Sequence, residues 1–207
     1  MSREILSYDA FKAITGNYMD VYANCIAESF EDYKKINSFN LSLDTFADFE
    51  IRTRASIIHD RICGRIKDKF QDKPTIKAGK WNHIFGLNFD DKIFLRHKKF
   101  KRGGIISCFK TPQHKAFLKQ GHIEGIPDKP VFIIGGYMPN DTFTELIGVY
   151  FSCWTANGVE WFVKVGEYVS EQGIIMFPQA ENVELNKKKR TKLKQPQQDE
   201  KIVVNKS

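Results

Sequence analysis

The segment HIFGLNFDDKIFLRHKKF, residues 83–100, decides the fold class of this chain. Two apolar runs, His83–Phe89 and Ile93–Phe100, have the length and the isoleucine and phenylalanine content of strands. The Asp90-Asp91 pair between them is typical of a turn. The segment therefore predicts a β-hairpin in the middle of the chain.

Helices are expected before this hairpin. Residues 7–36 place apolar side chains at three- and four-residue steps, with Ser7 as the first cap and a break at Gly16-Asn17. A second amphipathic pattern predicts a long helix that is capped by Asp44 and ends near Phe70. The N-terminal helices are expected to cover another side of the core or to form a small subdomain.

Strands and one short helix are expected after the hairpin. Thr111-Pro112 is a favourable helix start. The runs 131–138, 145–155 and 159–165 have the pattern of strands, and residues 173–178 are a candidate edge strand.

Helices followed by mostly antiparallel strands indicate an α+β fold, with a sheet of about five strands packed on the long helix. We expect three parts along the chain. They are an N-terminal helical segment (1–42), an α+β core domain (43–185) and a disordered basic tail (186–207).

Positive charge is concentrated in two stretches. The 207 residues carry a formal charge of +7, but residues 1–185 hold 24 Lys and Arg against 23 Asp and Glu, and residues 186–207 hold 8 against 2. Residues 92–119 contain nine basic residues and no acidic one. A stretch of this kind attracts polyanions, although a solvated loop held against the acidic remainder gives the same pattern.

The candidate nucleic-acid contacts are basic residues of this stretch and of the tail. They are Arg96, Lys98, Lys99, Lys101, Arg102, Lys110, Lys115, Lys119, Lys187, Lys188, Lys189 and Arg190. Strand alternation predicts that Arg96 and Lys98 share one face. The interleaved aromatics Phe94, Phe100, Phe109 and Phe117 either stack on unpaired bases or pack in the core.

Two enzyme classes were weighed against this interpretation. His59-Asp60 is the dyad of metal-dependent phosphohydrolases, which usually take further His and Asp ligands from other helices. Here the remaining histidines fall in expected strands, loops or a short helix. A magnesium-dependent nuclease needs an acidic residue two positions before a lysine on a strand, and the run after Asp91 has none. Both dyads have simpler structural interpretations, as hydrogen-bonding or turn residues.

The four cysteines, Cys25, Cys63, Cys108 and Cys153, form no CxxC pair, which argues against a structural zinc site. We predict no cofactor, no metal ligands and no catalytic residue. No apolar run is long enough to span a bilayer and the first residues lack a signal-peptide pattern, so a cytoplasmic protein without membrane contact is expected.

Four motifs carry a resemblance to a known group of proteins. RASIIHDRICGRI (54–66), LRHKKF (95–100), EGIPDKP (124–130) and CWTANGVEWFVKV (153–165) resemble an uncharacterised bacterial family associated with prophages and other mobile elements. Its members are similar to proteins encoded beside ImmA/IrrE-type metallopeptidases and helix-turn-helix repressors. The resemblance covers about residues 50–166, with departures at His97 and Phe100, and it implies no established activity. The chain lacks HExxH, so it is not the peptidase itself.

These observations favour a non-catalytic accessory protein of mobile DNA, in regulation or defence, that contacts nucleic acid phosphates through its basic segment. Two alternatives stay open. One is a regulator that binds a partner repressor or peptidase, and the other is a metal-dependent nuclease. The oligomeric state and the choice between DNA and RNA are open as well.

Overall fold

The structure, a computed structural model, describes residues 3, 5–109 and 111–165. Lys110, Lys187–Arg190, the remainder of the expected tail and the candidate strand at 173–178 lie outside the described residues. The described part has four helices and seven strands, which confirms the α+β class. It contains no helix whose length and apolar character would let it cross a membrane.

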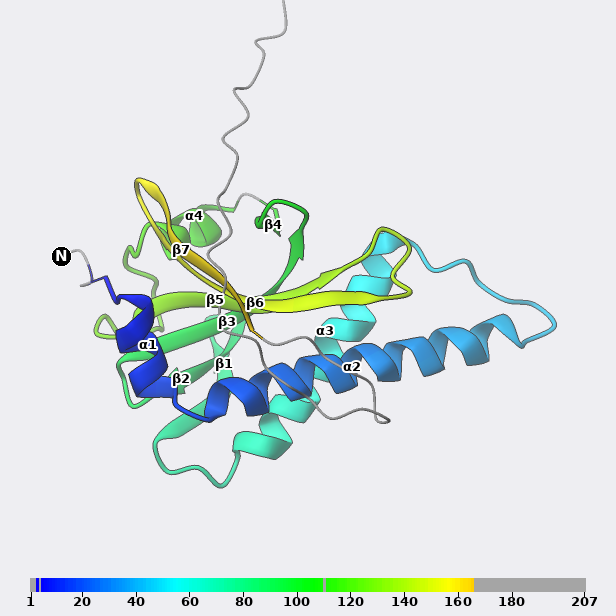
Figure 1. Ribbon diagram of the computed structural model, residues 1–207, viewed down its shortest axis with the longest axis horizontal. Coiled ribbons are helices and arrows are strands. Elements are labelled where there is room, and N and C mark those ends of the chain that lie inside the picture. Colours follow the sequence, from blue (N-terminus) through cyan, green and yellow to red (C-terminus); the bar gives the residue numbers. More distant parts are fainter. Residues whose placement is uncertain (1–2, 4, 110, 166–207) are drawn as a thin grey trace, which may run out of the picture.

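The seven strands form a single mixed sheet (Figure 1). They are β1 (Ile76–Trp81), β2 (Ile84–Phe89), β3 (Ile93–Lys101), β4 (Ile105–Ser107), β5 (Val131–Pro139), β6 (Leu146–Thr155) and β7 (Gly158–Val165). The order is β1-β2-β3-β5-β6-β7, and β4 pairs with β3 beside this path. Among the described strands all pairs are antiparallel except β3 with β5.

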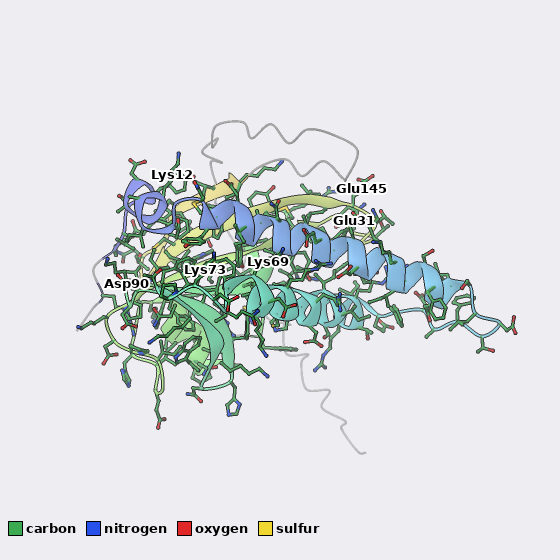
Figure 2. All side chains as sticks on the ribbon, turned by 90° about the horizontal axis from the view of Figure 1, so that it is seen from below. Lys12, Glu31, Lys69, Lys73, Asp90 and Glu145 are labelled. Atoms are coloured by element: carbon green, nitrogen blue, oxygen red, sulfur yellow. The ribbon has the colours of Figure 1, made fainter. Side chains whose placement is uncertain are left out.

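Three helices cover one face of the sheet. They are α1 (Tyr8–Thr15), α2 (Tyr18–Leu41) and α3 (Ile51–Phe70), and their buried residues form one apolar cluster with Leu87, Leu95, Ile133 and Phe151 of the strands. Figure 2 looks onto this side and shows α2 and α3 next to each other in front of the sheet. Arg65 of α3 pairs with Glu28 and Asp32 of α2, which fastens the two helices together.

The opposite face is covered by α4 (Pro112–Leu118) and the segment that follows it. Phe117, Ile123 and Ile126 pack there against Phe94 and Phe132 of the strands. Figure 1 shows α4 and the first three helices on opposite sides of the sheet. The fold therefore has helices on both faces, and the N-terminal helices share the face of α3 instead of covering another side.

Two expectations about the elements need correction. The sheet has seven strands instead of about five, because β1 and β4 are held by pairing with β2 and β3 although their sequences are short or rich in lysine and glycine. The long helix begins at Ile51 and not after Asp44. The side chain of Asn40 bonds both the N–H and the carbonyl of Ala47, and these bonds hold the connecting loop to the end of α2.

One edge of β3 changes partner in the middle of the strand. β2 pairs with β3 as far as Arg96, and β4 takes over on the same edge at Lys99. β5 occupies the other edge from Ile93 to Lys99. His97 and Lys98 therefore lie where the sheet divides between β2 and β4. The side chains that could bind a ligand, which are histidines, cysteines and half-buried cations, lie around them.

Candidate functional site

Successive side chains of β3 point to opposite faces of the sheet, as the sequence predicts. Arg96 and Lys98 point toward α4, where the Arg96 guanidinium carbon lies 5.6 Å from the ring centre of Phe117. His97 and Lys99 point toward the other helices, where the Lys99 ammonium lies 4.8 Å from the ring centre of Phe143. This alternation separates the basic segment into two chemically different sites.

Arg96 and Lys98 are half-buried cations, and the described residues give neither of them an acidic partner. Neither forms an ion pair with any residue that the structure describes, and one terminal guanidinium nitrogen of Arg96 is buried without a hydrogen-bond partner there. Burial lowers the pKa of Arg96 to about 10. Burial, with repulsion from Arg96, lowers the pKa of Lys98 to about 8. Both side chains still carry positive charge at neutral pH, so the α4 side of the sheet favours an anion here.

Cys108 and His114 lie beside these two cations. The Cys108 Sγ is 2.8 Å from Nε2 of His114, which Thr111 helps to place by capping α4. Burial, followed by the charges of Arg96 and Lys98, lowers the pKa of His114 to about 4. The imidazole is therefore neutral at physiological pH, and the positive charge of this face comes from β3.

A side-chain bond fixes α4 over the place where the sheet divides. Gln113 donates a hydrogen bond of 3.0 Å to the carbonyl oxygen of Asn82, in the turn between β1 and β2. Asn82 directly precedes His83 and β2, so this bond links α4 to the end of the β1–β2 hairpin.

The other candidate contacts do not join one surface. Lys101 and Arg102 are exposed at the β3–β4 turn, where Arg102 lies 3.8 Å from Asp141, and Lys115 and Lys119 are exposed along and after α4. Lys99 lies on the opposite face, so the structure separates it from Lys98. The basic segment is contiguous in the sequence but not in space.

One of the four interleaved aromatics is available to a ligand. Phe94, Phe100 and Phe117 are buried, which confirms the core interpretation for them. Phe109 is 79% exposed and directly follows Cys108. Exposed aromatic rings combined with basic side chains are what proteins use to bind single-stranded nucleic acid.

The acidic pair Asp90-Asp91 lies in the β2–β3 turn, with positive φ at both residues. Asp91 accepts a hydrogen bond of 2.6 Å from the side chain of Asn88, and Asp90 pairs with Lys92 at 3.0 Å. These contacts support the interpretation of the pair as turn residues.

His59 has partners that sequence reasoning missed. Instead of acting with the exposed Asp60, it contacts Cys63 and packs against His97, with ring centres 4.6 Å apart and the ring planes tilted by 39°. The ligand atoms of His59, Cys63 and His97 all lie within 4.8 Å of one another. The four-residue spacing of His59 and Cys63 was the available sequence signal. The third member comes from a strand 34 residues further on.

Comparisons with known proteins add no assignment. The chain matches no protein-family model, no curated protein and no solved structure. The resemblance to a mobile-element family stays a prediction.

Proposed function

We propose that this protein binds single-stranded nucleic acid on the α4 side of the sheet, where Arg96 and Lys98 each contact a backbone phosphate. The observation that carries the proposal is the half-buried pair of cations for which the described residues supply no carboxylate. A partly buried charge without a counter-ion is costly, and a bound anion offsets that cost. A phosphate suits the planar guanidinium of Arg96, which can donate two parallel hydrogen bonds.

Phe109 favours a nucleic acid over a small anion. Its exposed ring can stack on an unpaired base while phosphates of the same nucleic acid reach the two cations. Lys115 and Lys119 are exposed on the same side of the sheet and add long-range attraction for the nucleic acid. The contact is to backbone and to base faces, so it is tolerant of sequence.

The role is that of an accessory protein without catalysis, and its connection to mobile DNA rests on the resemblance of its motifs alone. The competing function is recognition of an acidic protein partner by the same cations. The two differ in their response to salt and in the part played by Phe109.

Fluorescence anisotropy with labelled single-stranded DNA and RNA of one sequence, over a series of salt concentrations, tests the proposal. Neutralising Arg96 and Lys98 together, Arg96→Gln with Lys98→Gln, removes two phosphate contacts. The slope of log K against log salt should become shallower by about 1.4, at about 0.7 per contact for single strands. Lys98→Gln alone should change it by about half as much.

The matched control is Lys12→Gln with Lys69→Gln. It removes the same charge from the helix-covered side, where both residues are exposed (Figure 2), and it should leave the slope unchanged. The proposal is refuted if the folded double variant at Arg96 and Lys98 has the same salt slope and affinity as its control and the wild type. That result would favour the protein partner.

A further inference from the structure

Three side chains with metal-binding atoms meet between α3 and β3. Cys63 Sγ lies 3.5 Å from Nε2 of His59 and 3.5 Å from Nε2 of His97. In a tetrahedral zinc site, with Zn–S of about 2.3 Å and Zn–N of about 2.0–2.1 Å, sulfur and nitrogen ligands are roughly 3.5 Å apart. The two measured separations match this geometry, and all three ligand atoms lie within 4.8 Å of one another. One ion fits between them once the two imidazole nitrogens approach the roughly 3.3 Å of a tetrahedral site.

The fold fixes the three side chains independently of one another. His59 and Cys63 are one helical turn apart on α3, so they share a face of that helix. His97 is 3% exposed, and its ring packs against Phe85 with centres 5.5 Å apart. A cluster that is held by a helix and by the middle of a strand changes little when an ion binds.

A buried hydroxyl beside the cluster lacks a hydrogen-bond partner in the described structure. Tyr22 of α2 is 1% exposed, and its oxygen has no partner among the described residues. It lies 2.8 Å from the position that a Cβ would take at Gly135, which is the residue of β5 in register with His97. Gly135 and His97 share the helix-covered face, so the hydroxyl of Tyr22 points into the space next to the His97 side chain.

We propose that His59, Cys63 and His97 bind one Zn²⁺ ion, with a water molecule as the fourth ligand that donates a hydrogen bond to the hydroxyl oxygen of Tyr22. Two imidazoles and one thiolate form a ligand set that zinc prefers, and Cys63 loses its proton to solvent when it binds. Three protein ligands leave the fourth position of the ion to water, whereas structural zinc sites usually have four protein ligands. This centre is separate from the proposed phosphate contact, which lies on the other face of β3.

Titration of the chelator-treated full-length protein with Co²⁺ tests the site. We expect one ion per chain, the intense visible bands of tetrahedral cobalt and a thiolate-to-cobalt charge-transfer band, all of which Zn²⁺ removes by displacement. Cys63→Ser should abolish the charge-transfer band. Cys108→Ser is the matched control, because Cys108 also contacts a histidine but on the other face, and it should keep the band.

The absence of stoichiometric cobalt and zinc binding by the folded wild type would overturn the proposal. So would a charge-transfer band that persists in Cys63→Ser. His59→Gln changes a second ligand at a less buried position and should weaken cobalt binding at least tenfold. Far-ultraviolet circular dichroism checks that this variant folds.

Tyr22→Phe tests the fourth position. The variant removes an unpartnered buried hydroxyl, so the metal-free protein should melt at the same temperature as the wild type or above it. Loss of a hydrogen bond to a metal ligand typically weakens metal binding about 10–100-fold, and we expect a loss in that range. Unchanged zinc affinity in Tyr22→Phe would contradict the assignment of Tyr22.

Discussion

Lys98 and Lys99 are neighbours in the chain, but their ammonium groups lie on opposite faces of the sheet. Lys98 is close to Arg96 and Cys108 on the α4 side, whereas Lys99 lies over the ring of Phe143 among the residues that pack against α2. A one-residue step thus moves a charge from the proposed nucleic acid site to the helix-covered side.

Phe109→Ala should weaken binding of single-stranded nucleic acid by about 5- to 150-fold, because stacking of one base on an aromatic ring contributes about 1–3 kcal/mol. Anisotropy with the labelled strand measures the change. Phe39→Ala is the control, since Phe39 is 68% exposed but lies at the far end of α2. If both variants bind as tightly as the wild type, Phe109 is not a stacking residue.

Gly136→Ala should destabilise the protein by at least about 3 kcal/mol. A Cβ at Gly136 would overlap the carbonyl oxygen of Lys98, so the parallel pair β3–β5 would have to separate. Gly64→Ala is the opposite case, because Gly64 lies within α3 with open space around it. Alanine there should raise the free energy of unfolding by about 0.5–1 kcal/mol.

Urea unfolding of both variants measures these changes. A Gly136→Ala protein as stable as the wild type would show that β3 and β5 are not paired in this register around Lys98.

The pKa of His114 makes its contribution to stability depend on pH. An unfolded histidine has a pKa of about 6.5, and the folded value is about 4, because burial and then Arg96 and Lys98 disfavour the charged ring. Between these values the unfolded chain binds a proton that the native protein does not. Stability should therefore fall as the pH is lowered from 6.5 to 4.

His114→Gln removes this contribution, so its melting temperature should decline less steeply over the same pH range than that of the wild type. Other histidines stay in both proteins, and the difference between the two slopes isolates residue 114. Identical slopes would show that His114 is not held neutral in the folded state.

Local patterns predicted much of the fold. Ser7 caps α1 and Thr111 caps α4 as expected, and the Asp90-Asp91 turn joins β2 to β3. Each of these features depends on residues close together in the chain. The shared face of Arg96 and Lys98 followed from strand alternation alone, and the structure confirms it.

Features that depend on distant pairing were missed. β1 has the sequence IKAGKW, whose lysines and glycine disfavour a strand, and it exists because every one of its residues pairs with β2. The meeting of His97 with His59 and Cys63 depends on how α3 lies across β3, which no spacing in the sequence records. The prediction of no structural zinc site rested on the lack of a CxxC pair, and such spacing gives no information on side chains that a helix and a strand bring together, as for His59, Cys63 and His97.

Comparison of Lys98→Gln with Lys99→Gln tests the central claim most directly. The two variants remove the same charge from adjacent positions, so long-range attraction for a polyanion falls equally in both. With labelled single-stranded nucleic acid, we expect Lys98→Gln to lower the affinity and to reduce the salt slope by about 0.7, and Lys99→Gln to keep the wild-type slope. Equal slopes in the two folded variants would contradict a phosphate contact at Lys98 and with it the proposed site.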